Sequence, residues 1–249
     1  MVRGIWLGLV MVLIATPAAA DIGEPVKIAA PASVASAPSY KFFKSGADRQ
    51  QPGAYWNPCD TITYGIDFRS ATKRGLSKRW EKRRWQSAIA ELSAASGLRF
   101  TYVGQIRTRA AKGRPARVTG VDNPITYGGT RSYRKALKGS IAGVAGVTWG
   151  VGHRGTRRQI DAGYVVIDAD EIVRSISSWN QPFDARPAAQ RKPDPVRALY
   201  LHEFGHALGL EHVGDNRQIM YPKLSTTRPD MLGAGDMAGL RKLGRQRCF

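Results

Sequence analysis

The chain has 249 residues and a formal net charge of +19 at pH 7, from 38 Lys and Arg against 19 Asp and Glu. Its hydrophobic share of 43% and charged share of 23% are those of a globular protein and exclude an intrinsically disordered chain. The charge favours anionic partners, either polymers of a cell envelope or acidic substrates, and no recognisable module predicts specific binding of nucleic acid.

The N-terminal residues have the pattern of an export signal. Arg3 supplies a short positive segment, residues 5–16 are apolar, and Ala18, Ala19 and Ala20 form a small-residue cleavage site. We therefore expect a signal peptide over residues 1–20, a cut after Ala20 and a secreted protein. An uncleaved membrane anchor is the alternative, which the short apolar run disfavours.

The segment after the cleavage site differs from the rest of the chain. Residues 21–53, and residues 28–38 above all, are rich in Ala, Pro and Ser and contain little to bury. This composition predicts a flexible leader. The folded part is then expected over residues 54–249, which is long enough for one domain with a sizeable core.

Two cysteines are present, Cys59 and Cys248. In an exported protein two cysteines usually pair, so the sequence predicts a disulfide between the start of the folded part and the last residues of the chain.

The first half of the predicted domain has a β–α–β order. Residues 61–68 alternate and are rich in β-formers, and residues 98–103 form a second such run. Between them, residues 78–96 predict a helix, with Trp85, Ile89 and Leu92 on one face. This order suggests two parallel strands joined by a crossover helix. The basic stretch 107–120 is expected to be a surface loop.

The second half contains two further strands and two helices. Residues 141–151 are rich in Gly and Val and predict a strand with bulges, and residues 164–167 predict a buried strand. After a polar loop over residues 177–194, Asp194 and Pro195 are a favourable N-cap and first residue of a helix. A last helix is expected over residues 235–243.

The helix that starts at Pro195 carries the most informative motif, His-Glu-Phe-Gly-His-Ala-Leu-Gly-Leu-Glu-His over residues 202–212. His202 and His206 lie four residues apart, so both imidazoles reach one ion from one helix face. Gly209 can end the helix and turn the chain, which brings His212 back as a third ligand. Three protein ligands leave one tetrahedral position open, as in a catalytic zinc site. An ordinary helix with satisfied histidines is the alternative.

A second motif follows at Ile219-Met220-Tyr221-Pro222. The extended HExxHxxGxxH pattern is a metzincin signature, and this segment resembles the Met-turn of the same clan. Together the two motifs resemble the matrixin branch of the metzincins, most specifically over residues 162–243. The resemblance implies an α/β (α+β) zincin-like catalytic domain, with a twisted mixed sheet, an active-site helix and a small C-terminal subdomain.

The resemblance also implies an activity. We expect a zinc metalloendopeptidase with one catalytic Zn²⁺ held by His202, His206 and His212. Glu203 would take a proton from a zinc-bound water and deliver it to the leaving amine. Met220 would form a hydrophobic floor below the ligands.

The substrate is expected to be a protein or peptide, held in extended form. It would pair with an edge strand within residues 141–150. Residues after the Met-turn, with Tyr221, Pro222 and Lys223 as candidates, would line the pocket for the side chain that follows the cleaved bond. Lys223 or Arg228 could favour acidic side chains there.

The chain departs from the animal matrixins in several ways. Only His153 lies outside the zinc motif, which excludes a second zinc site built from several histidines. Asp168, Asp170 and Glu171 could bind calcium, but their pattern favours surface positions at a strand end. The residues around Cys59 do not resemble the inhibitory cysteine motif of a matrixin pro-segment, which again favours the disulfide.

Two other functions stay open. The first is an envelope-associated basic protein that binds anionic polymers on a metzincin scaffold, and the second is a zinc hydrolase of cell-wall peptide amides. The positive charge can also be a solvated surface with no dedicated partner. A monomer is expected.

Overall fold

The computed structural model describes residues 13–14, 39–43, 52–111, 114–128, 133, 136–137, 139–151, 158–175, 181–187, 190–224 and 230–249. The predicted signal peptide and leader lie largely outside these residues, and His153 and Arg228 lie wholly outside them. None of the helices in the described part has the length and hydrophobicity that a membrane span requires.

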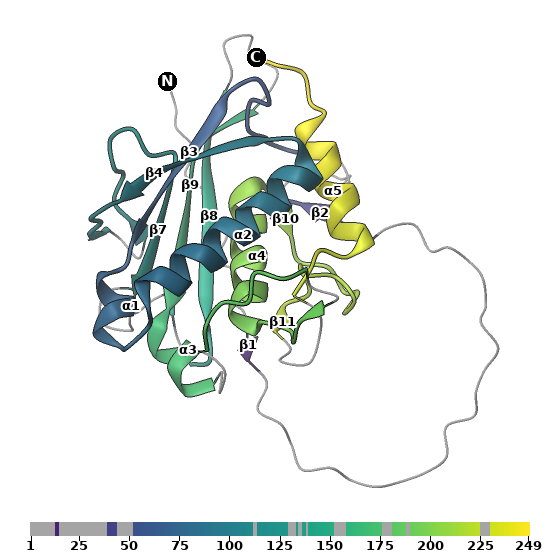
Figure 1. The fold of residues 1–249 in the computed structure, drawn as a ribbon. Helices are drawn as coiled ribbons and strands as arrows, with labels where there is room; N and C mark the ends of the chain where they lie inside the picture. The colour runs from purple at the N-terminus through teal and green to yellow at the C-terminus, as the bar shows by residue number, and fades with distance from the viewer. Residues whose placement is uncertain are drawn as a thin grey trace, which may run out of the picture.

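A five-stranded mixed sheet forms the centre of the molecule (Figure 1). Four strands run parallel, and the fifth lies antiparallel at one edge. In spatial order the strands are β4 (Arg99–Gln105), β3 (Thr61–Asp67), β7 (Asn123–Gly128), β9 (Arg158–Asp168) and β8 (Gly143–Val151). This mixed α/β architecture agrees with the fold class predicted from the sequence.

The predicted crossover is present between β3 and β4, which pair in parallel. Helix α2 (Lys78–Ser96) joins them and ends at Gly97, whose φ of 80° is a left-handed conformation that glycine adopts without steric cost. The expected bulge in β8 is also present, between Thr148 and Trp149. The expected N-cap of α4 (Pro195–Leu208) is formed by the Asp194 carboxylate, which accepts hydrogen bonds from the amides of Val196 and Arg197.

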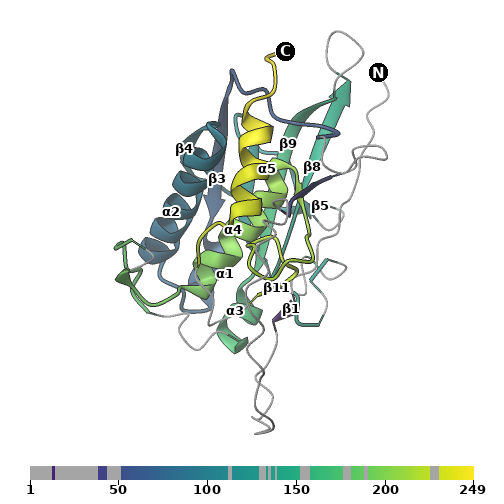
Figure 2. The ribbon, with the colours of Figure 1, turned by 90° about the vertical axis from the view of Figure 1, so that its right-hand side faces the viewer.

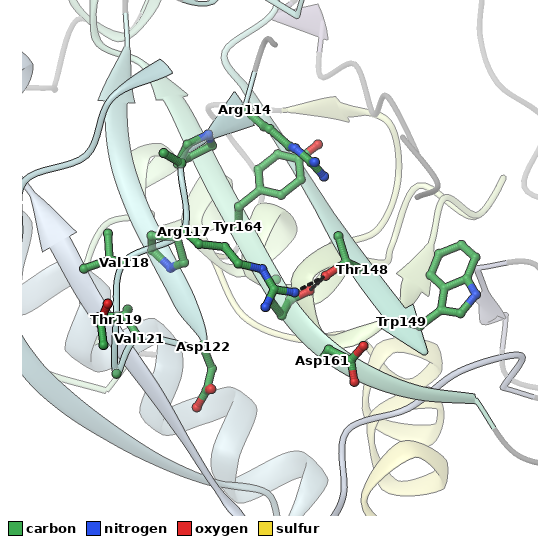
Figure 3. Close-up of a pocket in the computed structure, with 16 residues that line it drawn as sticks. Arg114, Arg117, Val118, Thr119, Val121, Asp122, Thr148, Trp149, Asp161 and Tyr164 are labelled. Carbon is green, nitrogen blue, oxygen red and sulfur yellow. Dashed lines mark hydrogen bonds between the residues drawn. The ribbon is translucent and has the colours of Figure 1, made fainter. Parts of the chain in front are cut away.

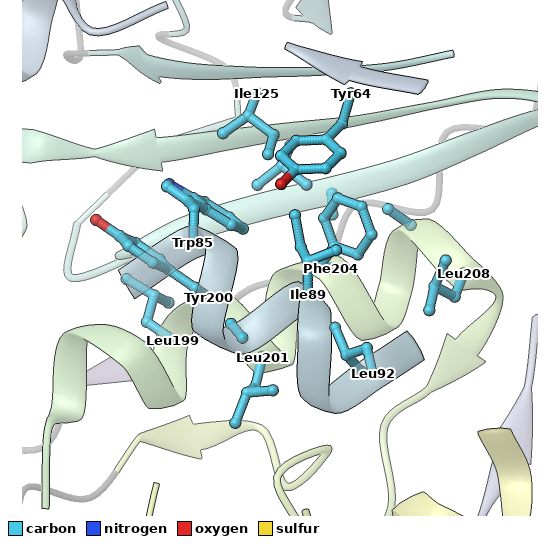
Figure 4. Close-up of a cluster of buried hydrophobic side chains, with 14 of the residues drawn as sticks. Tyr64, Trp85, Ile89, Leu92, Ile125, Leu199, Tyr200, Leu201, Phe204 and Leu208 are labelled. Carbon is cyan, nitrogen blue, oxygen red and sulfur yellow. The ribbon is translucent and has the colours of Figure 1, made fainter. Parts of the chain in front are cut away.

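Helices α2, α4 and α5 (Ala234–Gly244) cover one face of the sheet (Figures 1 and 2). In the core, Trp85, Ile89 and Leu92 of α2 pack against α4 and against sheet residues such as Ile125 (Figure 4). The indole of Trp85 stacks on the ring of Tyr200 with 4.0 Å between centroids. The opposite face of the sheet carries a second, smaller apolar cluster of Tyr133, Ala136, Leu137, Ile141, Val144, Tyr164 and Val166.

Several elements were not predicted. Strand β7 begins with Asn-Pro and is buried throughout, so it shows neither alternation nor a clean run of β-formers. The stretch expected to be a loop contains a small antiparallel pair, β5 (Ala110–Ala111) and β6 (Arg114–Pro115). The other short elements are α1 (Arg69–Lys73), α3 (Ala169–Ser175), β1 (Leu13–Ile14) paired with β11 (Lys223–Leu224), and β2 (Lys41–Phe42) paired with β10 (Leu210–Glu211).

The expected surface position of the acidic residues after β9 is wrong for two of them. Asp168 and Glu171 are 1% and 4% exposed. One carboxylate oxygen of Asp168 accepts hydrogen bonds from the amides of Asp170 and Glu171, so Asp168 starts helix α3. Asp170 instead pairs with Arg74 of the turn after α1. Glu171 pairs with Arg174 one turn further along α3. The second oxygen of Asp168 has no hydrogen-bond partner among the described residues.

The predicted disulfide joins Cys59 to Cys248 across 189 residues of sequence. Beside it, the ring of Phe249 stacks on Tyr55 with 4.9 Å between centroids. The bridge fastens the segment after α5 to the segment that leads into β3. A closed loop of this length can stabilise a fold by up to about 5 kcal/mol through restriction of the unfolded chain.

A buried polar network joins α2 to the start of α4. The carboxylate of Glu81, 0% exposed, accepts hydrogen bonds from the hydroxyls of Tyr127 and Tyr200 and from Arg84. The same guanidinium donates to the carboxylate of Asp194 at 2.7 Å. Arg84 therefore connects Glu81, the buried acid of α2, to Asp194, the N-cap of α4, which is the helix that carries the histidine motif.

We expect Arg84→Ala to lower the free energy of unfolding by about 3–5 kcal/mol, because it leaves the Glu81 carboxylate buried without its cation. Denaturant unfolding of the purified variant measures this change. Arg186→Ala is the matched control, since Arg186 forms an exposed pair with Asp184 and its loss should change stability by less than about 1 kcal/mol. Equal effects of the two substitutions would contradict the role of the network.

Candidate metal centre and active site

The C-terminal half of α4 and the chain that follows it bring three histidines together. His202 and His206 lie one helical turn apart on α4 and are 1% and 0% exposed. The helix ends at Gly209, whose φ of 115° lets the chain reverse into β10. His212 follows directly and faces the other two. The structure thus forms the turn that the sequence predicted.

The ring nitrogens of the three histidines converge. The Nε2 atom of His202 lies 3.0 Å from Nε2 of His206 and 3.1 Å from Nε2 of His212. Ligands held 2.0–2.1 Å from a tetrahedral ion lie about 3.3 Å from one another, so this spacing fits one shared metal ion. Among the described residues, this is the one group of three or more His, Cys, Asp or Glu side chains that could hold a metal ion.

Hydrogen bonds at the Nδ1 atoms of His202 and His206 determine that their Nε2 lone pairs face the point where the three rings converge. The Nδ1 atom of His202 lies 2.7 Å from the carbonyl oxygen of Ile219, and Nδ1 of His206 lies 2.8 Å from that of Leu210. A carbonyl oxygen only accepts, so each Nδ1 carries the proton and each Nε2 of a neutral ring presents a lone pair. Lone pairs 3.0 Å apart repel unless a cation lies between them. The donor set therefore fits a bound metal.

Burial keeps these rings neutral. Removal from water lowers the pKa of His202 to about 3 and that of His212 to about 4, and the neighbouring imidazole adds to the effect at His202. Burial also holds the pKa of His206 well below its usual value. Neutral imidazole is the form that binds metal, so the fold prepares the ligands for an ion.

Glu203 is a buried carboxylate without a partner. Its side chain is 0% exposed, and neither oxygen has a hydrogen-bond partner among the described residues. Burial raises the pKa of Glu203 well above its usual value. The side chain packs against β8, where a Cβ at Gly143 would lie 2.8 Å from Cδ of Glu203. Glycine at position 143 therefore lets the edge strand pass directly over this carboxylate.

Met220, the expected Met-turn residue, packs against the histidine helix at Gly205. It is 2% exposed, and a Cβ at Gly205 would lie 2.7 Å from its sulfur atom. The turn that carries Met220 is held by Asp236 of α5, which accepts hydrogen bonds from the amides of Ile219 and Met220 at 2.6 and 3.2 Å. The sequence placed Asp236 only at the start of the last helix and did not predict this contact.

Comparison with known proteins agrees with this geometry. Residues 132–244, a little under half of the chain, match the family model of the matrixins. Over this segment the chain is matrixin-like. A stretch of 77 residues is 36% identical to metalloendoproteinase 1 of Glycine max and covers 30% of this chain and 23% of that protein. The match thus spans less than a quarter of the relative's length. The resemblance to the matrixins that the sequence predicted is confirmed over this segment.

A cavity of about 460 Å³ adjoins the Met-turn in this matrixin-like segment. Two predicted pocket residues, Tyr221 and Lys223, line it, whereas Pro222 does not. Apolar residues from α4, the turn and the segment before α5 supply much of the lining, among them Ala198, Ile219, Leu224, Met231 and Leu232. Asn216, Arg217 and Gln218 add polar groups to it. The pocket is therefore largely apolar, with Lys223 at an exposed position.

The far wall of this pocket is fixed by a cluster of charges that the sequence analysis missed. Arg197 of α4 pairs with Glu91 of α2 at 2.6 Å and also donates to the backbone carbonyl of Asp230. The Asp230 carboxylate accepts two hydrogen bonds from Arg191. Glu91 in turn accepts from the amide of Leu232 at 2.8 Å. Leu232, which lines the pocket, is thus joined to α2 through Glu91 and to α4 through Arg197. These residues are far apart in the sequence.

We expect Glu91→Ala to raise the hydrogen-exchange rate of the amides at residues 230–233 by about tenfold or more, because it removes the acceptor of the Leu232 amide and one partner of Arg197. The α4 amides should change much less. Hydrogen–deuterium exchange read by mass spectrometry checks both. Glu91→Gln is the matched control, since its side-chain oxygen can still accept from Leu232. Unchanged exchange at 230–233 in the alanine variant would refute the anchoring role.

Proposed function

We propose that this chain is a zinc-dependent endopeptidase, in which His202, His206 and His212 hold the ion and Glu203 is the catalytic base. The observation that carries the proposal is the set of converging Nε2 lone pairs beside a buried carboxylate without a partner. The matrixin match and the metalloendoproteinase relative support it.

The chemistry of the donors favours zinc. Three neutral imidazoles are a common ligand set of catalytic zinc, and the burial of two of them suits an ion that needs a dry site. When bound, zinc would polarise the scissile carbonyl and lower the pKa of a water molecule toward neutrality. Glu203 would take the proton from the attacking water, hold it, and transfer it to the leaving amine. Its raised pKa makes it a stronger proton acceptor than an exposed glutamate.

The substrate is proposed to be a peptide segment in extended form. In the described part of the chain, β8 pairs only with β9, so one edge of β8 is free to add a strand. Gly143 on this strand lies against Glu203, which would bring the main chain of an added peptide close to the base. The side chain after the cleaved bond would enter the apolar cavity next to the Met-turn, where Lys223 could also attract an acidic residue.

Secretion is part of the proposal. The apolar N-terminal segment and its small-residue site support export, and the disulfide between Cys59 and Cys248 supports an oxidising compartment. Cell-wall peptide amides remain an alternative substrate of the same centre. Cleavage rates for an unfolded protein, compared with those for wall cross-peptides, separate the two substrates.

The charge supports a second candidate function, binding to an anionic polymer. Four cations of α2 lie within six residues, and none has an ion-pair partner among the described residues: Lys78, Arg79, Lys82 and Arg83. Electrostatic binding of this kind would weaken steeply with salt. Binding without hydrolysis would favour this candidate over the peptidase.

We expect Glu203→Gln to lower kcat for a peptide substrate by about 10²–10⁴-fold, because the amide cannot take a proton, while zinc content stays at one ion per chain. Rates with a quenched fluorescent peptide library and metal analysis of the same samples measure both. Met237→Leu, a change of similar volume at a half-buried position of α5, is a control that should retain full activity. Undiminished hydrolysis by the Glu203 variant would overturn the assignment of the base.

We expect zinc affinity to change by less than about tenfold between pH 7 and pH 5 and to fall steeply below pH 4. The pKa values of about 3 and about 4 keep His202 and His212 neutral down to that range. Three exposed histidines with pKa near 6.5 would instead lose about four orders of magnitude over the same interval. Competition with a chelator at each pH measures the affinity, and a fall that starts near pH 6.5 would contradict the buried, neutral site.

A further inference from the structure

A second cavity, of about 640 Å³, lies on the face of the sheet opposite the active-site helix (Figure 3). Tyr164 lines it, and this residue belongs to the small apolar cluster on that face, whereas its neighbour Val165 belongs to the core under the helices. Residues 114–122 form one wall, and Thr148 and Trp149 of β8 form the other. No feature of the proposed mechanism uses this space.

The walls of the cavity are held by hydrogen bonds, so it is formed before any ligand binds. The Asp122 carboxylate accepts from the amide and the hydroxyl of Thr63 at 2.7 and 2.8 Å, which ties residues 114–122 to β3. Arg117 reaches across and donates to the hydroxyl of Thr148 at 3.3 Å. One oxygen of the Asp122 carboxylate thus holds this wall of the cavity against β3.

The two ends of the cavity differ in charge (Figure 3). Arg114 lies beside Tyr164 at one end, is half-buried, and has no ion-pair partner among the described residues. Asp161 lies at the other end, next to Gly150. A half-buried guanidinium gains most from an anionic partner, and a carboxylate matches its geometry in a bidentate manner. The Arg114 end thus fits an acidic side chain.

Strand β8 connects this cavity to the active site. Gly143 lies against Glu203, and Gly146, three residues further, pairs with Tyr164 and lies directly under its hydroxyl. At about 3.3 Å per residue, the charged end of the cavity begins about 10 Å along the strand from the catalytic carboxylate. A peptide added to the free edge of β8 would point alternate side chains to this face of the sheet.

We propose that the cavity is a substrate subsite for an acidic side chain, three to five residues from the cleaved bond on the part of the peptide that pairs with β8, with Arg114 as the specificity-determining residue. The inference rests on the proposed peptidase function, because it uses the same edge strand. It adds a preference at a different position of the substrate from the pocket beside the Met-turn, and it acts on the opposite face of the sheet.

The test measures peptide binding to the zinc-loaded Glu203→Gln protein by calorimetry, so that binding is read without cleavage. Peptides of one sequence carry Glu or Gln at each position from three to five residues on either side of the cleaved bond. We expect Glu to bind about tenfold more tightly than Gln on one side only, and Arg114→Gln to abolish this difference. Arg117→Gln is a second variant, which removes a cation of the cavity wall and its contact with Thr148. It should reduce the difference in affinity between the Glu and Gln peptides.

Arg109→Gln is the matched control, since it removes the same charge from an exposed position nearby that does not line the cavity. It should preserve the difference between Glu and Gln within about twofold. Equal effects of Arg109→Gln and Arg114→Gln, or no preference for Glu at any position, would overturn the subsite. If the unaltered protein binds the acidic peptides through Arg114 but cleaves none, the peptidase proposal fails and the site stands as a peptide-binding site.

Discussion

The metal centre depends on two backbone carbonyl groups. The oxygens of Ile219 and Leu210 each accept a hydrogen bond from Nδ1 of a histidine, and this choice of tautomer leaves both Nε2 lone pairs directed at the same point. Neither carbonyl belongs to the helix that carries the histidines. The site therefore requires the Met-turn, which carries Ile219, to be in place. The Asp236 carboxylate of α5 holds the Met-turn through the amides of Ile219 and Met220.

This dependence explains why the C-terminal elements are fastened so firmly. Helix α5 follows the Met-turn and supplies Asp236, and the disulfide to Cys248 ties the chain beyond α5 to the segment before β3. At the other end of α4, the chain of contacts from Glu81 through Arg84 to Asp194 sets where the helix begins. The histidine helix is thus positioned at both ends by charged groups that take no part in metal binding. Such support keeps ligands within the narrow tolerances that a catalytic site requires.

Two groups in the centre are held in states that a folded protein ordinarily avoids. The Glu203 carboxylate is buried without a hydrogen-bond partner, and the imidazole lone pairs face each other at 3.0 Å. Each arrangement is unfavourable in isolation. A divalent cation relieves the repulsion among the imidazoles, and its charge stabilises the nearby carboxylate. The unfavourable free energy of these two arrangements in the absence of an ion therefore indicates that the site binds a cation. Such local departures from the usual rules of folding are expected at functional sites.

The parts of the fold that the sequence predicted are those encoded by local patterns. The apolar face of α2 with its terminal Gly97, the N-cap at Asp194 and the turn at Gly209 each follow from residues close together in the chain. Strand β7 lacks such a pattern, because all six of its residues are buried and the second is proline. The partners of Asp236, of Glu91 and of the two histidine Nδ1 atoms were also missed, because most of these contacts join residues more than fifteen positions apart.

The same distinction separates the two cavities. The pocket beside the Met-turn could be predicted because a family motif precedes it in the chain, whereas the cavity at Arg114 is assembled from β6, β9, β8 and the loop before β7, which no local pattern connects. The edge strand β8 links the cavity at Arg114 to the Glu203 carboxylate, because it lines that cavity and also packs against Glu203. Gly143 on that strand accommodates Glu203 on one face, and Gly146 accommodates the Tyr164 hydroxyl on the other. Side chains at these positions would block the base or fill the approach to Arg114. The glycines that weakened the prediction of β8 as a regular strand are thus the residues that let one strand serve both faces of the sheet.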